Sequence, residues 1–113
     1  AFDKVEIFNL IGAGKVVFVD VTADWCLTCK VNKALVIDRG RVGHHLGVGN
    51  VVAMRADWTR PNPEISAYLQ RFGRFGIPFN VVYGPGRPSG IALPELLTEA
   101  RVMDAFTRAG LKK

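Results

Sequence analysis

Cysteine is scarce in this chain: Cys26 and Cys29 are the only two among 113 residues. A disulfide-rich secreted scaffold is therefore excluded, because such scaffolds depend on several bridges. A single bridge across two intervening residues closes a loop too short to add much stability. The two sulfur atoms are better explained by chemistry than by structural support, either as a reactive pair or as half of a metal site.

Long apolar runs are also missing. No stretch approaches the 18 or so residues that a membrane span needs, and no signal-peptide pattern opens the chain. The sequence has no internal repeat, so its length suits one domain over residues 1–113. Because it begins with Ala1, we expect a processed product or a segment of something longer.

Positive charge is present but not concentrated. The formal net charge is +5 and the pI is near 9.6, yet the bases are scattered and no run of four occurs. Nucleic-acid interfaces gather such charge in a patch or a stripe. We therefore interpret the bases as a solvated surface and expect no nucleic-acid partner.

Apolar periodicity predicts alternating helices and strands in the first half of the chain. A helix is expected at 3–11. The β-branched run at 16–23, interrupted by Asp20, indicates a buried central strand, and 51–56 indicates its parallel partner. Glycines interrupt 40–49, which we interpret as a loop. Between the first strand and this loop, the spacing of the apolar residues predicts a helix. Its apolar face is formed by Leu27, Val31, Ala34 and Leu35.

The second half predicts a helix, a hairpin and a closing helix. Asn and Pro begin the first of these helices, at 62–73, and Thr caps the last, at 98–110. Strands at 79–83 and 91–97 flank the turn GPGRPSG, and Pro94 marks the second strand as an edge. The whole pattern predicts an α/β fold with a mixed central sheet of about four strands and helices on both faces.

The two cysteines lie where the first strand gives way to a helix. If that helix begins near Trp25, Cys26 lies in its first turn and Cys29 projects from the same side. Free amide groups and the macrodipole at a helix start stabilise a thiolate, the nucleophilic form of cysteine. We therefore expect Cys26 to be an exposed nucleophile with the lower pKa, which attacks a disulfide of a partner protein and forms a mixed disulfide with it. Cys29 is expected to be shielded and to resolve this mixed disulfide by displacing the partner.

Asp20 precedes Cys26 by six residues and is expected to lie beneath the helix start. Burial there would raise its pKa and let it accept the Cys29 proton near neutral pH, so we interpret it as the base of the resolving step. The alternative is an aspartate at a strand end in contact with solvent.

Two further features adjoin the cysteines. Pro78, which follows Ile77 ahead of the predicted hairpin, is either a simple strand start or a cis proline. In the second case its loop packs against the cysteines and leaves the Ile77 backbone free to pair with an extended partner segment. Trp25, beside the nucleophile, is either an apolar docking surface for a partner or packing at the helix start, and we expect a mixture of the two.

Zinc binding is the alternative from another functional class. Cys26 and Cys29 have the spacing of half a structural zinc site, and His44 and His45 follow them. Adjacent histidines are poorly placed to converge on one ion, however, and the chain has no second such cysteine pair. We therefore expect no metal and no other cofactor, but redox chemistry of the cysteines themselves.

Taken together, these residues resemble the thioredoxin superfamily: an aspartate six positions before the first cysteine, then WCLTCK, then Gly-Ile-Pro ahead of a hairpin. The resemblance is closer to the C-terminal periplasmic domain of the DsbD family, including its ScsB-type relatives. The stretches that carry this closer resemblance are VDVTADWCLTCKVNK at 19–33, ADWT at 56–59 and RFGRFGIPFNVVYGPG at 71–86.

The resemblance implies a thioredoxin-like fold and a thiol:disulfide oxidoreductase. Such a domain relays electrons from the membrane-embedded domain of its own polypeptide to a periplasmic partner, such as the N-terminal domain of that polypeptide. The chain would then be a monomeric, periplasmic domain excised from an inner-membrane protein. A free-standing thioredoxin-like reductase or a disulfide isomerase uses the same cysteine pair and stays an alternative.

The resemblance also assigns roles to single residues: Cys26 is the nucleophile, Cys29 the resolving cysteine, Asp20 the buried acid and Pro78 the cis proline. Some DsbD members carry a glutamate at the position that Lys33 occupies here. A lysine is expected either to lower the pKa of Cys26 or to pair with Asp20.

Overall fold

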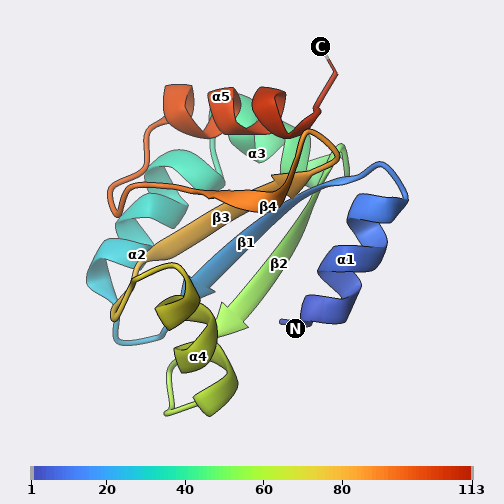
Figure 1. Ribbon diagram of the computed structural model, residues 1–113. Coiled ribbons are helices and arrows are strands. Elements are labelled where there is room, and N and C mark those ends of the chain that lie inside the picture. Colours follow the sequence, from blue (N-terminus) through green and yellow to red (C-terminus); the bar gives the residue numbers. More distant parts are fainter. Residues whose placement is uncertain (1, 113) are drawn as a thin grey trace.

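A four-stranded mixed sheet forms the centre of the structure, with the strand order β2-β1-β3-β4 (Figure 1). The computed structural model describes residues 2–112. Strand β1 runs parallel to β2 and antiparallel to β3, and β3 runs antiparallel to β4. The predicted mixed sheet is therefore confirmed. The strands are β1 (Val16–Thr22), β2 (Val51–Asp57), β3 (Phe79–Gly84) and β4 (Arg87–Ala92).

Helices cover both faces of this sheet (Figure 1). Alternate side chains of β1 point to opposite faces, so Val17 and Val19 pack with α1 and α4, whereas Phe18 packs with α3 and α5. No helix within residues 2–112 is long and apolar enough to cross a membrane. The helices are α1 (Lys4–Gly12), α2 (Leu27–Asn32), the π-helical turn η1 (Lys33–Ile37), α3 (Gly40–Gly47), α4 (Pro63–Arg71) and α5 (Glu99–Ala109).

Side-chain caps fix where three of the helices begin. Asp3 accepts the backbone N–H of the first turn of α1, Asn62 does so at α4, and Thr98 at α5. Helix α5 ends at Gly110, whose φ of 119° lies in the left-handed region that glycine adopts without strain. The predicted starts of these helices and the end of α5 are confirmed.

The loop predicted at 40–49 is wrong, because most of this segment forms helix α3. Val42 and Leu46, at helical spacing, turn toward the core, and their burial outweighs the poor helix propensity of the glycines. Gly43 is needed for close packing, since a Cβ there would lie 2.8 Å from the carbonyl carbon of Asp38.

The hairpin is also tighter than predicted. Its turn lies at Pro85 and Gly86 only, β4 begins at Arg87, and 93–97 is a loop rather than a strand. Helix α5 explains the tight turn, because the N–H of Gly86 donates to the carbonyl of Ala109 at 2.9 Å, and a side chain at Gly86 would collide with the end of α5.

The apolar face predicted for the helix after β1 lies outward. Leu27 and Leu35 are 76% and 59% exposed, whereas the buried side of α2 carries Cys29 and Asn32. The period of the pattern thus located the helix correctly, but the apolar residues do not mark its buried side. Since no residue of the described part of the chain covers these leucines, they form an exposed apolar stripe along α2 and η1.

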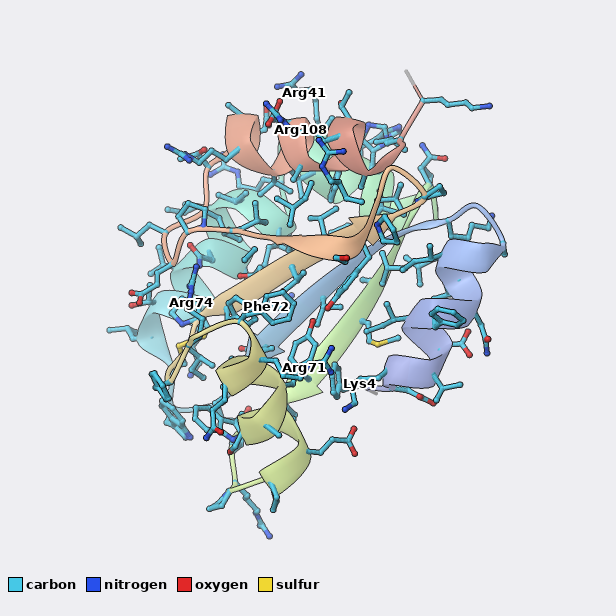
Figure 2. The ribbon with its side chains drawn as sticks, viewed as in Figure 1. Lys4, Arg41, Arg71, Phe72, Arg74 and Arg108 are labelled. Atoms are coloured by element: carbon cyan, nitrogen blue, oxygen red, sulfur yellow. A yellow bond between two sulfur atoms is a disulfide. The ribbon has the colours of Figure 1, made fainter. Side chains whose placement is uncertain are left out.

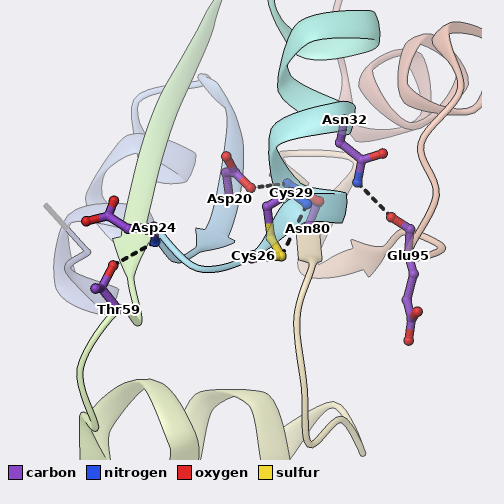
Figure 3. Close-up of a disulfide and its surroundings, with 8 residues drawn as sticks. All are labelled: Asp20, Asp24, Cys26, Cys29, Asn32, Thr59, Asn80 and Glu95. Carbon is purple, nitrogen blue, oxygen red and sulfur yellow. Dashed lines mark hydrogen bonds between the residues drawn. A yellow bond between two sulfur atoms is a disulfide. The ribbon is translucent and has the colours of Figure 1, made fainter.

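Asn32 ties α2 to the loop at 93–97. Its Nδ2 donates to the carbonyl of Glu95 at 2.7 Å, as Figure 3 shows, and its Oδ1 accepts the N–H of Leu97 at 3.1 Å. The side chain is 3% exposed. Asn32 therefore replaces the missing strand pairing of this loop with one buried and one partly buried hydrogen bond.

We predict that Asn32→Ala lowers the free energy of unfolding by about 1–3 kcal/mol, because it leaves the buried N–H of Leu97 without a partner. Urea unfolding of the purified domain measures the loss. Asn50→Ala is the matched control, because Asn50 is exposed and its side chain hydrogen-bonds only to His45 among residues 2–112. It should change stability by less than about 0.5 kcal/mol. Equal losses in the two variants would contradict the role assigned to Asn32.

Candidate active site

The two cysteines form a disulfide at the carboxyl end of β1, where the chain enters α2 (Figure 3). Helix α2 begins at Leu27, slightly later than the predicted start near Trp25, with Cys26 as its N-cap. The backbone N–H of Cys29 donates to the Sγ of Cys26 at 3.2 Å. The helix start therefore directs a free N–H group at the first sulfur, which is the arrangement that stabilises a thiolate once the disulfide is reduced.

Both cysteines are buried in this disulfide form, at 6% and 5% exposure for Cys26 and Cys29. The predicted exposure of Cys26 is therefore wrong for this state. The side chain of Cys26 turns inward to bond with Cys29 and packs with Ala23 and Ile77. What distinguishes the two sulfurs here is their position on the helix rather than their exposure.

Asp20 lies between two polar partners in the register of the sheet. It pairs with Arg55 of β2 on one side and with Asn80 of β3 on the other, so all three side chains share one face. The Nδ2 of Asn80 donates to the Oδ1 of Asp20 at 2.8 Å. Asp20 and Cys29 also line the same cavity of about 170 Å³. The predicted placement of Asp20 beneath the start of α2 is confirmed.

Burial is the main influence on Asp20, and it raises the pKa of the carboxyl. The hydrogen bond from Asn80 and the positive charges of Arg55 and Lys33 act in the opposite direction. Lys33 does not pair with Asp20, since its Nζ lies 2.5 Å from the Oδ2 of Asp38. Of the two expectations for Lys33, the pairing with Asp20 is therefore wrong. The balance leaves Asp20 with a raised pKa, which suits proton transfer closer to neutral pH than an ordinary aspartate allows.

The Ile77–Pro78 peptide bond is cis, as the second interpretation of Pro78 predicts. Pro78 is buried, and Ile77 is half-buried and packs against the cysteines. Within residues 2–112, the backbone of Ile77 enters no strand pair and no loop hydrogen bond. Its backbone polar groups are therefore free beside the disulfide.

Arg74 holds the loop that leads to this proline. Its Nη2 donates to the carbonyl of Leu93 at 3.3 Å, and its guanidinium carbon lies 5.0 Å from the centre of the Phe79 ring.

Figure 2 shows Arg74 apart from Arg41 and Arg108, which lie by α3 and α5. The labelled cations thus come from separate elements, in keeping with the scattered bases of the sequence.

Trp25 is 61% exposed next to Cys26, and its indole is held in place. The Nε1 of Trp25 donates to the carbonyl of Thr59 at 3.0 Å, and its ring lies 6.5 Å from that of Trp58. The Oγ1 of Thr59 accepts the N–H of Asp24 at 2.9 Å (Figure 3). The end of β2 therefore fixes the loop that precedes the disulfide, and Trp25 both packs there and offers an apolar surface.

Sequence reasoning missed two of these residues. Thr59 stands in the quoted stretch ADWT, and a polar residue just beyond a strand was a weak signal of a loop contact. The role of Asn80 could not be inferred, because it depends on the β1–β3 register, which sets this residue opposite Asp20. An amide within an apolar strand was visible, but its partner was not.

The described residues contain no group of three or more His, Cys, Asp or Glu side chains placed to hold a metal ion. His44 and His45 lie on α3, and His45 contacts Asn50 rather than the cysteines. Both cysteines are taken up by the disulfide.

Known proteins resemble this chain in sequence and in fold. A sequence profile described as thioredoxin-like matches residues 11–85. The thiol:disulfide interchange protein DsbD 1 of Pseudomonas aeruginosa is 36% identical over 74 residues, which cover 66% of this chain and 12% of that protein. DsbD of Ralstonia nicotianae is 34% identical over 70 residues, or 62% of this chain and 11% of that protein. The chain thus spans only about an eighth of these relatives.

Among solved structures, the oxidised C-terminal domain of DsbD from Neisseria meningitidis is similar in fold. Its TM-score is 0.71 at 23% sequence identity, over 94% of this chain and 91% of that one. This likeness supports the assignment of the fold.

We predict that Asp20→Asn changes how stability depends on pH. Folding raises the pKa of Asp20, so in the wild type the folded state loses stability relative to the unfolded state as pH rises from about 4 through the folded pKa. Asparagine does not titrate. The difference in unfolding free energy, variant minus wild type, should therefore be smallest below about pH 4, grow through that window and then level off. Urea unfolding at a series of pH values measures it, and a difference that does not vary with pH would contradict the assignment.

Proposed function

The chain belongs to the thioredoxin-like family, and we propose that it is a thiol-disulfide electron relay that accepts electron pairs from a membrane-embedded domain and reduces a periplasmic partner. The observation that carries this proposal is the Cys26–Cys29 pair at the start of α2, above Asp20 and beside a cis proline. Thiol-disulfide exchange needs no other redox group, because the two electrons that are transferred are carried by the cysteine sulfurs themselves.

The reaction proceeds in two exchanges. In the reduced domain, the Cys26 thiolate attacks a disulfide of the partner, so that a mixed disulfide forms and one partner sulfur leaves as a thiolate. Cys29 then loses its proton and attacks the Sγ of Cys26. The Cys26–Cys29 disulfide forms, the mixed disulfide breaks, and the second partner sulfur leaves. The partner gains two electrons, and the domain becomes the disulfide that the structure contains.

Asp20 takes the proton that Cys29 loses in the second exchange. The cavity that both residues line gives the proton a short route, and the raised pKa of Asp20 makes it a better base than an ordinary carboxylate. When a donor dithiol later reduces the domain, Asp20 returns the proton to the Cys29 thiolate.

Partner recognition uses the surface around the disulfide. The unpaired backbone of Ile77, held by the cis peptide bond to Pro78, can pair with an extended segment of the partner that carries the target cysteine. Trp25 offers an exposed apolar ring on a fixed loop beside Cys26. Backbone pairing of this kind tolerates many sequences, which suits a domain that exchanges electrons with more than one protein.

The resemblance to DsbD supports the identity of the partners. We propose that the domain is part of a longer inner-membrane protein, that it faces the periplasm as a monomeric unit, and that it links the transmembrane and N-terminal domains of its own polypeptide. No organic cofactor or metal takes part in this scheme. A free-standing thioredoxin-like reductase or a disulfide isomerase would use the same residues with different partners or a different redox balance.

We predict that Cys29→Ala, produced in the periplasm within the full-length polypeptide, accumulates mixed disulfides through Cys26, because the resolving thiol is absent. Non-reducing electrophoresis followed by mass spectrometry should identify cysteines of the N-terminal domain as the bonded partner. Cys26→Ala is the matched control and should form no such species, since it lacks the nucleophile. Mixed disulfides with unrelated proteins alone would contradict the relay and favour a free-standing reductase.

Equilibration of the isolated domain with glutathione separates the relay from an isomerase. A relay that delivers electrons should have a reduction potential below the roughly −180 mV of protein disulfide isomerase. A potential at or above that value would contradict the reducing role.

A further inference from the structure

Asn80 is a polar residue in a strand whose position in the core favours apolar side chains. It is the second residue of β3, between Phe79 and Val81, and it is 1% exposed. Every residue of β3 is buried. Burying an amide is costly unless hydrogen bonds compensate it, so packing alone does not explain the side chain.

The contacts of Asn80 point to Asp20. Its Nδ2 donates to the Oδ1 of Asp20 at 2.8 Å and lies 3.5 Å from the carbonyl of Val19. Its own Oδ1 has no hydrogen-bond partner within residues 2–112. The oxygen of the Asn80 amide is therefore buried without a hydrogen bond, while its NH₂ group donates to the carboxyl of Asp20.

We propose that Asn80 is a positioning residue for Asp20, and that its amide fixes the carboxylate toward Cys29 and sets how strongly that carboxylate holds a proton. The proposal rests on the proposed function, in which Asp20 is the base of the resolving step. No residue of the described chain donates to the Oδ2 of Asp20, so with Asn80 on Oδ1 the second oxygen is free to take the Cys29 proton.

Asn80 differs from the other groups that act on Asp20 in being buried. The charged side chains that line the cavities around the Asp20 carboxyl are all exposed, so salt and water weaken their electrostatic effect on its pKa. A hydrogen bond inside the sheet is not screened in this way and favours the ionised form of its acceptor. The exposed charged residues are Asp24, Lys30, Lys33, Asp38 and Arg55.

The resolving step then balances as follows. The S–H bond of Cys29 breaks and its proton moves to the Oδ2 of Asp20, while the sulfur attacks Cys26 and the thiolate of the partner leaves. Asn80 keeps its bond to Oδ1 throughout, so it steadies the carboxylate before the transfer. Without that donor, Asp20 would hold a proton more tightly and be ionised in fewer molecules at a given pH.

Asn80→Leu tests this role, because leucine fills a similar volume and donates no hydrogen bond. The carbon-13 shift of the Asp20 carboxyl, followed against pH in the reduced domain, reports its proton affinity directly. We expect Asn80→Leu to raise that affinity about tenfold or more, since hydrogen bonds to charged groups are among the stronger ones. Asn80→Thr, which keeps a donor, should lie between Asn80→Leu and the wild type and guards against a variant that fails to fold.

The resolving step is measured with the aromatic disulfide dithiobis(nitrobenzoic acid). Cys26 releases one coloured thiolate on attack, and Cys29 releases the second on resolution. Asn80→Leu should move the pH midpoint of the second release upward, in step with the carboxyl titration. In an Asp20→Asn background the same substitution should leave the pH profile unchanged, a result that a merely structural role would not produce.

The two readouts separate the possible failures. An unchanged carboxyl titration in Asn80→Leu overturns the role of Asn80, whatever the release rates are. A shifted titration with a second release that neither Asn80→Leu nor Asp20→Asn alters overturns the proposed base role of Asp20, and with it the part of Asn80 in resolution.

Discussion

The site depends on one constraint, the start of helix α2 at its N-cap Cys26, after a short turn that follows strand β1. Because the helix starts there, the N–H of Cys29 is free to point at the first sulfur instead of a carbonyl within the helix. The second sulfur lies a turn further along, over the end of the sheet. The same junction thus brings the sulfurs within bonding distance and gives only the first of them the N–H of Cys29 as a donor.

The register of the sheet supplies the second half of the site. Three neighbouring strands place Arg55, Asp20 and Asn80 side by side on the face beneath α2. A slip of one residue between β1 and β3 would turn Asn80 to the opposite face and leave Asp20 without its donor. The buried valines that surround these residues therefore do more than stabilise the fold, because their alternation fixes the register on which the hydrogen bond between Asn80 and Asp20 depends.

Local chemistry in the sequence was sufficient to predict much of this arrangement. The run at 16–23, the cysteine spacing and the caps at Asn62 and Thr98 each act over a few residues, and the structure confirms the elements that they predict. Features set by distant packing were beyond the sequence. They include the helix at 40–47, the tight turn against α5, the outward face of α2 and the inward turn of Cys26.

The inequality of the two sulfurs is the central claim, and alkylation of the reduced domain tests it most directly. Cys29→Ala leaves only Cys26, and Cys26→Ala leaves only Cys29, so each variant reports one thiol. At neutral pH, iodoacetamide should modify Cys26 at least about tenfold faster than Cys29, because the helix start favours its thiolate. Equal rates in the two variants would contradict the account.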